Sequence, residues 1–392
     1  MLPYPHVEAA KPLIIAHRGS PCSIPEETLA GYQQAIDDGA NFVEMDVIAS
    51  KDGQLVCRHD LTLDDSTNVE QVSEFADRRS THTLPDGRNQ TGFFVSDFTL
   101  AEIQTLYARQ AMPFRDQSTT ALLRVPSLDE VLQLVVRNGQ QGKHVGVYIE
   151  TKGPSFHDSI GMPLERPLVQ ALLRAGFLDI TKIPVILQSF ESQSLEKMSL
   201  ELKALRKPAL PLVWLLGCDS NVTDAELDEF ATFGTHIGPD KDLLAPVDWT
   251  PECSRPAEAP KCAFQSGQQC IGRLQTPPGS HPPGGKAAQQ AQRAQQAGSL
   301  VQRAHQRGLQ VHAFTFRNEG MFMAIDFRSD PFAELSYFAG PEGLGVDGVL
   351  VDGPATAHNW VQYINGAGAD QRPATFVNHN DPASANATNT WP

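Results

Sequence analysis

Short runs of apolar and β-branched residues recur along this chain, and stretches with a helical spacing of apolar residues separate them. Strands that alternate with helices in this way predict βα units, whose strands lie parallel in one sheet. We therefore expect an α/β fold. The strand candidates, in chain order, are Leu13–Ala16, Phe42–Ile48, Leu55–Arg58, His144–Ile149, Pro184–Gln188, Leu212–Leu216, His236–Gly238, Gln310–Phe314 and Gly348–Val351.

These nine candidates exceed by one the eight strands of a closed (β/α)8 barrel. Either His236–Gly238 is a loop, or Leu55–Arg58 is only a hairpin partner of the preceding strand. The tripeptide Lys51-Asp52-Gly53 between those two strands is typical of a tight turn. The sequence leaves both alternatives open.

Two helices can be placed from their spacing and their end signals. Pro25 is expected to open the first, in which Leu29, Tyr32, Ala35 and Ile36 recur at helical spacing and Gly39 marks the end. A second helix is expected over Ser299–Arg307, where Gly308 ends it before the strand that starts at Gln310.

Three segments interrupt the alternation of strands and helices. Residues 62–125 are polar, follow His59 closely, and are expected to form a cap over a site at the strand ends. Residues 251–285 are rich in Pro, Gly and Gln and are expected to form a surface excursion, and residues 366–392 read as a polar, loosely attached tail. We expect one domain over residues 1–365 that carries both insertions.

Ionisable residues gather where the predicted strands end. Five apolar pieces finish at or just before such residues, around His17, Asp46, His59, Glu150 and Asp352. Because a barrel brings the carboxyl ends of its strands to one face, we expect these side chains to form a single site.

Glu44 and Asp46 lie two apart on one strand and therefore point to the same face. Two carboxylates beside apolar neighbours repel each other unless a cation lies between them. With Glu150 at the end of another strand, the three supply oxygen ligands that suit Mg²⁺ or Ca²⁺. The alternative is that they are ordinary strand-end acids paired with lysines.

His17 and His59 each follow an apolar strand and stand next to a charged residue. Two histidines flanking a metal-bound phosphate could supply the base and the acid that cleave a P–O bond. Asp60 could orient the ring of His59, or it could cap the next turn.

Arg18 and Lys152 supply fixed positive charge for phosphate oxygens, although Lys152 could instead neutralise one of the acids. The sequence contains no Gly-x-Ser-x-Gly, no P-loop, no dinucleotide fingerprint after a strand and no His-Glu-x-x-His. No other catalytic template competes with the phosphodiester chemistry.

The formal net charge of −15 argues against non-specific binding to nucleic acid or to an anionic membrane surface. An anionic substrate must therefore be attracted by local positive charge or by a metal ion. No apolar run is long enough to span a bilayer.

The cysteines and the first residues bear on location. Cys253, Cys262 and Cys270 crowd into the Pro/Gly-rich stretch without a Cys-x-x-Cys pair, so a disulfide is favoured over a zinc site. The first residues lack the basic start and apolar stretch of a signal peptide, so the protein is either cytosolic or processed. We expect a periplasmic or secreted protein.

Taken together, the motifs resemble those of the glycerophosphodiester phosphodiesterase family, in its larger periplasmic or secreted branch. They occur in order over most of the chain, with Glu27 standing where the family often has Asn. We expect that position to serve the turn and the start of the helix. The motifs are His17-Arg18-Gly19, Pro25-Glu26-x-Thr28-Leu29, Glu44-x-Asp46, Lys51-Asp52-Gly53 with His59-Asp60, Glu150-x-Lys152, Gln188-Ser189-Phe190, Val311-His312-x-Phe314-Thr315-Phe316 and Gly345-Val346-Asp347-Gly348.

The resemblance implies a TIM barrel with a divalent metal on Glu44, Asp46 and Glu150. It implies His17 and His59 as the acid–base pair and Arg18 and Lys152 as phosphate contacts. The expected reaction is hydrolysis of a glycerophosphodiester, such as glycerophosphocholine or glycerophosphoethanolamine, to sn-glycerol 3-phosphate and an alcohol. Ca²⁺ is favoured over Mg²⁺. The alternatives are a lysophospholipase D-type or sphingomyelinase D-type enzyme on the same scaffold, and an exported non-catalytic binding protein.

Overall fold

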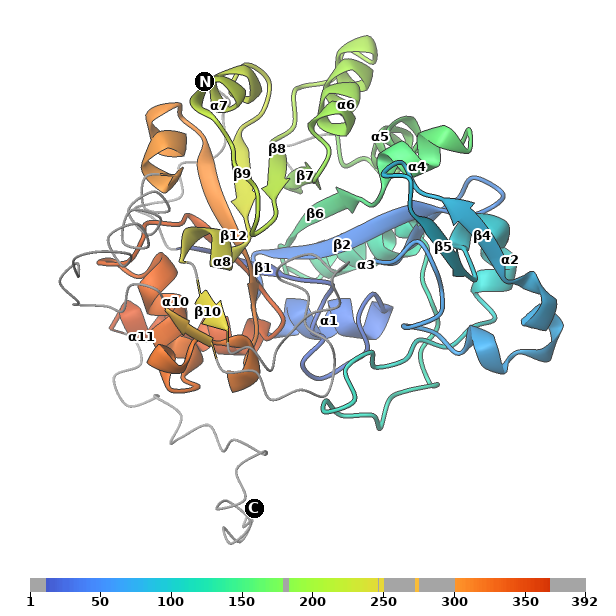
Figure 1. Cartoon of the computed structure of the whole chain (residues 1–392), viewed down its shortest axis with the longest axis horizontal. Helices are drawn as coiled ribbons and strands as arrows, with labels where there is room; N and C mark the ends of the chain where they lie inside the picture. The colour runs from blue at the N-terminus through green and yellow to red at the C-terminus, as the bar shows by residue number, and fades with distance from the viewer. Residues whose placement is uncertain (1–11, 179–182, 246, 250–271, 275–299, 367–392) are drawn as a thin grey trace, which may run out of the picture.

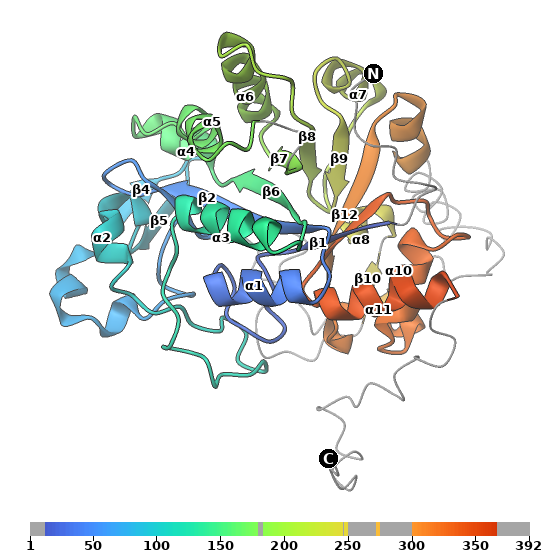
Figure 2. The ribbon, with the colours of Figure 1, turned by 180° about the vertical axis from the view of Figure 1, so that it is seen from behind.

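The computed structural model describes residues 12–178, 183–245, 247–249, 272–274 and 300–366. Its centre is a closed barrel of parallel strands surrounded by helices, as Figures 1 and 2 show from opposite sides. The predicted α/β class and TIM-barrel architecture are therefore confirmed. The barrel strands are β1 (Leu13–Ala16), β2 (Phe42–Ala49), β6 (Gly146–Thr151), β7 (Val185–Ser189), β8 (Leu212–Leu216), β9 (His236–Pro239), β12 (Gln310–Phe316) and β13 (Gly348–Val351).

Around the barrel the strands follow the order β1-β13-β12-β9-β8-β7-β6-β2, and β2 pairs with β1 to close the ring. This order answers the question left by the strand count. Strand β3 (Leu55–Cys57) pairs antiparallel with β2, so it is the hairpin partner. Strand β9 lies parallel between β8 and β12 and is a full member of the barrel.

The helices cover the outside of the barrel. In chain order they are α1 (Leu29–Asp37), α2 (Leu100–Ile103), α3 (Leu128–Gln140), α4 (Pro154–Ser159), α5 (Glu165–Arg174), α6 (Ser192–Ala204), α7 (Asp224–Phe230), α8 (Lys241–Leu244), α10 (Pro331–Ala339) and α11 (Pro354–Ile364). Residues 300–306 are also helical, as expected for the segment before Gly308.

Helix α1 begins four residues later than Pro25, the predicted start. Thr28 is its N-cap: the Thr28 Oγ1 accepts a hydrogen bond from the Gly31 amide at 3.1 Å and donates one to the Pro25 carbonyl at 2.8 Å. The capping hydroxyl, rather than the proline, decides where this helix starts, because it satisfies an amide that the first turn leaves unpaired.

Alternation along β2 divides the apolar residues between two layers. Val43, Met45 and Val47 belong to the large core between the barrel and its helices. Phe42 points the other way and packs inside the barrel with Tyr148 and other inward-facing side chains. Glu44 and Asp46 share the inward parity of Phe42, which places their carboxylates inside the barrel at its carboxyl end.

The first insertion has a small core of its own. It contains the hairpin of β4 (Ser80–Thr83) and β5 (Asn89–Gly92), helix α2, and the 3-10 helices η2 (Val69–Gln71), η3 (Ser73–Arg78) and η4 (Val95–Asp97). Its apolar side chains, Phe98 among them, pack against Ile48 and Val56 of the β2–β3 hairpin. In Figure 1 this segment lies beside the barrel on the right.

Two further 3-10 helices, η6 (Gly320–Phe322) and η7 (Ile325–Phe327), follow β12. Of the second insertion, the structure describes β11 (Gly272–Leu274), which pairs antiparallel with β10 (Val247–Trp249). The rest of 251–285, with Cys253, Cys262 and Cys270, and the tail after Gly366 lie outside the described residues, so the division into one domain and a tail stays a prediction. In the described part of the chain, no helix combines the length and apolar character needed to cross a membrane.

Candidate active site

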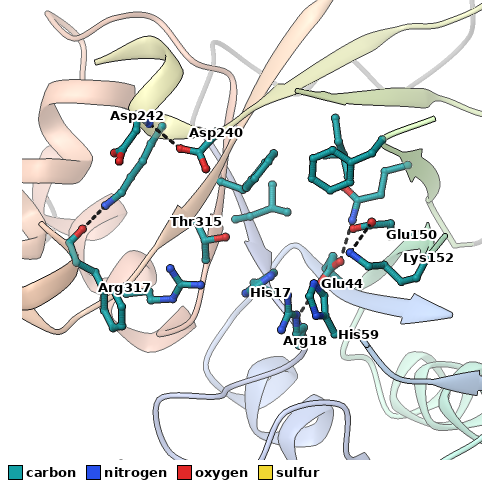
Figure 3. Close-up of a pocket in the computed structure, with 17 residues that line it drawn as sticks. His17, Arg18, Glu44, His59, Glu150, Lys152, Asp240, Asp242, Thr315 and Arg317 are labelled. Carbon is teal, nitrogen blue, oxygen red and sulfur yellow. Dashed lines mark hydrogen bonds and ion pairs between the residues drawn. The ribbon is translucent and has the colours of Figure 1, made fainter. Parts of the chain in front are cut away.

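A cavity of about 220 Å³ opens at the carboxyl end of the barrel (Figure 3). Six of the seven predicted site residues line it: His17, Arg18, Glu44, His59, Glu150 and Lys152. The seventh, Asp46, is buried beneath them and contacts Arg18 and Lys152. The structure thus brings all seven together from four separate strand ends.

The turn after β1 sets the position of His17 and Arg18. The His17 amide donates to the Val351 carbonyl at 3.0 Å, and the backbone then turns with positive φ at Arg18 (+53°) and Gly19 (+94°). A Cβ on Gly19 would lie 2.8 Å from the carbonyl carbon of Gly31, so glycine is required there. The turn aims the Arg18 amide at Glu44 Oε2, 2.7 Å away.

The three predicted metal ligands form one acidic cluster. An oxygen from each of Glu44, Asp46 and Glu150 lies within 4.8 Å of the others, and all three side chains are buried. The register of β2 and β6 causes this, because Asp46 pairs directly with Glu150. Gln188 of β7 donates to Glu44 Oε1 at 2.8 Å and fixes that carboxylate.

Burial and neighbouring charges shift the pKa values of the three carboxyl groups in the cluster. Burial, reinforced by the charge of Asp46, raises the pKa of Glu44 well above its usual value, and burial raises the pKa of Glu150 to about 8. Burial also opposes ionisation of Asp46, but Lys152 and Arg18 outweigh it and keep the pKa of Asp46 below normal. Carboxylates held this close are stable as anions only with a compensating cation.

The donor set fits a hard divalent cation. Neither carboxylate oxygen of the buried Asp46 accepts a hydrogen bond, although one of them lies 3.1 Å from the Arg18 Nε. Buried carboxylate oxygens are normally satisfied by hydrogen bonds or by a metal ion. Glu44, Asp46 and Glu150 are therefore suited to hold such an ion through oxygen.

His17 is held by a carboxylate beyond the predicted set. Its Nδ1 lies 2.7 Å from Asp352 Oδ1, at the end of β13. Burial and the charge of Arg18 lower the pKa of His17 to about 4, so the ring is neutral at pH 7. Against burial, Arg115 and Arg317 keep the pKa of Asp352 well below normal, so this carboxylate stays ionised. The ionised Asp352 accepts from Nδ1–H and leaves Nε2 as the basic nitrogen.

His59 has a similar partner in Asp60, whose Oδ1 lies 2.7 Å from His59 Nδ1. Asp60 therefore orients the ring, which is the first of the two alternatives weighed for it. Burial opposes ionisation of Asp60, but the contact with His59 lowers the pKa of Asp60 to about 2. Two histidines, each with one ring nitrogen fixed by a carboxylate, thus face the same cavity (Figure 3).

Both predicted phosphate contacts are paired with acids of the cluster. Lys152 Nζ lies 2.7 Å from Glu150 Oε1, and Arg18 contacts Glu26 at 3.2 Å as well as Asp46. The salt bridge considered as the alternative for Lys152 is therefore present. Both cations also line the cavity, so they remain available to an anion placed there.

Three residues near the site, Asp352, Gln188 and Glu27, were not among the predicted site residues. Asp352 ended one of the apolar pieces and Gln188 lay in a motif, yet neither was given a role, because their contacts with His17 and Glu44 span the barrel. Glu27 was expected to serve the turn before the helix. It does lie in that turn, with φ of +55°, and in addition its buried carboxylate accepts from the Asp46 amide at 3.0 Å and from the Tyr32 hydroxyl.

The first insertion lies beside the cavity rather than over it. The residues that line the cavity come from the barrel strands and the segments that follow them, and none belongs to 62–125, all of which the structure describes. The expectation that this segment caps the site therefore needs correction, because its core packs on the β2–β3 hairpin. It reaches the site through Arg115, which pairs with Asp352 at 2.7 Å and with Glu319 at 2.6 Å.

Comparison with known proteins gives a consistent result. A model described as the "Glycerophosphoryl diester phosphodiesterase family" matches residues 17–238 and 280–356. The glycerophosphodiester phosphodiesterase GDPD6 of Arabidopsis thaliana is 34% identical over 371 residues, which cover 90% of this chain and 87% of that protein. A glycerophosphodiester phosphodiesterase of Bacillus subtilis is also 34% identical, over 59% of this chain and 69% of its own length.

Solved structures share the fold at low identity. A protein from Silicibacter pomeroyi superimposes with a TM-score of 0.57 at 18% identity and covers 91% of this chain and 95% of its own. An Oleispira antarctica phosphodiesterase, solved with the product sn-glycerol-3-phosphate, gives 0.51 at 18% identity, with 90% and 97% covered.

Proposed function

The chain belongs to the glycerophosphoryl diester phosphodiesterase family, and from this premise we propose how its cavity performs the reaction. The protein hydrolyses glycerophosphodiesters to sn-glycerol 3-phosphate and an alcohol with a divalent metal. The observation that carries the proposal is the convergence of two carboxylate-bound histidines, three buried acids and two cations on one cavity. Family membership favours this activity over the lysolipid-specific and non-catalytic alternatives.

The acids and cations hold the substrate. Glu44, Asp46 and Glu150 would bind the metal ion, which neutralises phosphate charge and lowers the pKa of a bound hydroxyl. Arg18 and Lys152 contact the non-bridging phosphate oxygens. The Oleispira antarctica protein was solved with the product sn-glycerol-3-phosphate, which supports a glycerol phosphate as the product proposed for this chain.

The histidines move the protons. His17, neutral at pH 7 and oriented by Asp352, accepts the proton from the attacking glycerol hydroxyl or water at Nε2. His59, held at Nδ1 by Asp60, donates the Nε2 proton of its protonated form to the departing alcohol oxygen. Because burial and the charges of Arg18 and Lys152 lower the pKa of His59, this form is the minor one at neutral pH. Attack by the glycerol hydroxyl would give a cyclic phosphate, which water then opens, whereas attack by water would give the product directly.

We propose Ca²⁺ as the native ion. Three carboxylates can be joined by several water or carbonyl oxygens in the looser shell of Ca²⁺, whereas Mg²⁺ demands a strict octahedron. Titration of the metal-stripped protein with each ion, followed by calorimetry, tests this. Tighter binding of Mg²⁺ than of Ca²⁺ would contradict it.

Export to the periplasm or the medium is likewise a proposal. Its support is Cys218, which is disulfide-bonded, because disulfides persist in oxidising compartments. Cys22 and Cys57 are free thiols. Immunodetection after fractionation of the producing cells tests the location, and a signal confined to the cytosol would contradict it.

The activity itself is tested with glycerophosphocholine, by following the release of sn-glycerol 3-phosphate and choline, beside a parallel reaction with lysophosphatidylcholine. We expect faster turnover of glycerophosphocholine. Turnover of the lysolipid alone would identify the lysophospholipase D-type alternative instead.

A further inference from the structure

The first insertion lies beside the barrel, yet one of its side chains reaches the carboxylate that orients His17. Arg115 donates through Nη2 to Asp352 Oδ2 at 2.7 Å, and Asp352 Oδ1 lies 2.7 Å from His17 Nδ1. Arg115 is buried and does not line the cavity. It can therefore influence the reaction through Asp352, but not by touching the substrate.

The loop that carries Arg115 is attached to the barrel independently of this contact. Gln110 is buried and donates from Nε2 to the Pro21 carbonyl at 2.9 Å, in the turn that follows β1. Gln117 donates to the Met112 and Arg115 carbonyls, both at 3.0 Å. Hydrogen bonds of the loop itself thus place Arg115 beside the strand ends.

A second carboxylate aligns the guanidinium of Arg115. Glu319, in the segment after β12, accepts from Nε at 2.6 Å and from Nη2 at 3.1 Å, so both of its oxygens are used. The remaining hydrogen on Nη2 is directed to Asp352. Because the guanidinium is a planar fork with fixed donor directions, this pairing fixes the position of the Asp352 carboxylate as well as its charge.

Arg317 also contacts Asp352, but its surroundings differ. Its Nε lies 3.1 Å from the same Oδ2, and its side chain lines the cavity, where it meets solvent and substrate. Burial raises the pKa of Asp352, and among the charges that oppose this effect Arg115 lowers the pKa more than Arg317 does. Arg115 is therefore the buried counter-ion of Asp352.

This counter-ion matters for the chemistry of His17. An ionised carboxylate accepts from Nδ1–H of a histidine and leaves Nε2 free to take a proton. A buried carboxylate that loses its cation is destabilised as an anion. A protonated or displaced Asp352 would no longer hold His17 in this tautomer and orientation.

We propose that Arg115 is a positioning residue for the acid–base reaction, because it holds the Asp352 carboxylate so that His17 presents an unprotonated Nε2 to the substrate. The first insertion thereby completes the active site from outside the barrel. This inference rests on the proposed function and adds a residue to its machinery. The competing explanation is that Arg115 only attaches the insertion to the barrel.

Two variants separate these explanations. In Glu319→Gln, the amide oxygen still accepts from Arg115 Nε, so the attachment is weakened while the contact with Asp352 remains. In Arg115→Gln/Glu319→Gln, the contact with Asp352 is lost as well, and no carboxylate is left unpaired by the loss of the arginine. Arg115→Met/Glu319→Leu, with apolar side chains in place of the ion pair, is the second form of this variant if the first does not fold.

The kinetic readout is kcat with glycerophosphocholine, measured on variants whose folding is checked by circular dichroism. We expect Glu319→Gln to stay within about threefold of the wild type. Either double variant should lose about 10–100-fold in kcat, with KM nearly unchanged because Arg115 does not touch the substrate. Arg78→Gln is the matched control, since Arg78 pairs with Glu102 inside the insertion, and it should keep the wild-type kcat.

A double-mutant cycle tests whether Arg115 acts through Asp352. Residues that act as a unit have non-additive effects. Removing Arg115 should therefore lower kcat very little further in a protein that already carries Asp352→Asn.

The tautomer of His17 gives a readout that needs no turnover. In ¹⁵N NMR spectra of the metal-free protein, we expect a protonated Nδ1 and an unprotonated Nε2 in the wild type and in Glu319→Gln. The double variants should show a mixture of both tautomers. The His17 signals are identified by their absence from His17→Ala.

Wild-type kcat in the double variants, or an equal fall in Glu319→Gln or Arg78→Gln, would show that Arg115 only attaches the insertion. Losses that multiply in the cycle with Asp352→Asn, or an unchanged His17 tautomer, would overturn the proposal as well. Failure of the wild type to hydrolyse glycerophosphocholine would contradict the proposed function alone, because the tautomer is measured without substrate.

Discussion

At the scale of single residues, the site depends on carboxylates that fix the two histidines. Asp352 contacts Nδ1 of His17 and also pairs with two arginines, Arg115 and Arg317. Asp60 contacts Nδ1 of His59. Each histidine thus keeps one defined nitrogen for proton transfer. Proton transfer, rather than binding, should therefore suffer most when either ring is removed.

Replacement of either histidine should abolish most of the activity. We expect His17→Ala and His59→Ala each to lower kcat by about 10²–10⁴-fold, the usual contribution of a positioned acid or base. Steady-state kinetics with glycerophosphocholine measures this, with the exposed His144→Ala as control. Losses under about fivefold in both variants would rule out their acid–base roles.

Glu44 should matter for the metal ion more than for the fold. Because burial favours its neutral form, Glu44→Gln keeps the shape of the side chain without a metal. The new amide oxygen can accept from the Arg18 amide, and the new amide nitrogen can donate to Gln188 Oε1 once the Gln188 amide turns over. In differential scanning calorimetry we expect the metal-free variant to melt near the metal-free wild type. Added Ca²⁺ should raise the Tm of the wild type and leave that of the variant nearly unchanged. An equal rise in both would exclude Glu44 as a ligand.

The sequence was sufficient to predict which ionisable residues at strand ends form the site, because strand direction alone brings His17, Glu44 and Glu150 to one face. It was insufficient for Asp352 and Gln188, whose roles depend on which strands are neighbours in the closed barrel. It also did not reveal the contacts of the buried Glu27 carboxylate with Asp46 and Tyr32, because they cannot be read from its position in the turn.

At the scale of elements, the turn between β1 and α1 links the fold to the chemistry. Gly19 allows the backbone of this turn to touch α1, and the adjoining Arg18 amide binds Glu44. The strands themselves were largely predictable, and β9 and β3 were ambiguous only because short apolar runs do not reveal their pairing direction.

Gly19→Ala should therefore cost more than the same change at another glycine with positive φ. Positive φ alone costs about 1–2 kcal/mol, and the contact with the Gly31 backbone adds about 1–3 kcal/mol. Gly53→Ala is the matched control, since nothing lies within 4 Å of its added Cβ. Urea unfolding of both variants measures the difference, and equal losses of stability would contradict the close approach.

At the scale of the whole molecule, buried neutral histidines make a destabilising contribution in acid. Burial lowers the pKa values of His157 and His236 to about 4 and that of His312 well below 6.5. A histidine of this kind takes up its proton more readily in the unfolded chain. Its contribution to stability is thus full above about pH 6.5 and is lost as the pH falls towards 4.

The contribution of these histidines to the free energy of unfolding should accordingly fall between pH 7 and pH 5, whereas buried acids with raised pKa values, such as Glu44 and Glu150, act in the opposite direction. His157, whose ring nitrogens have no hydrogen-bond partner, is the simplest one to remove. We expect His157→Leu to reduce the fall by about 1–2 kcal/mol. Urea unfolding at the two pH values measures it, and the exposed His144→Leu is the control. A fall of the same size in His157→Leu and wild type would contradict this origin.

The central claim is that one buried acidic cluster holds the metal ion on which phosphodiester hydrolysis depends. Its most direct test is release of sn-glycerol 3-phosphate from glycerophosphocholine by protein treated with EDTA, before and after a divalent ion is restored. We predict that activity disappears with EDTA and returns with Ca²⁺ in the wild type, but not in Glu44→Gln. Undiminished turnover after complete removal of metal would contradict the account.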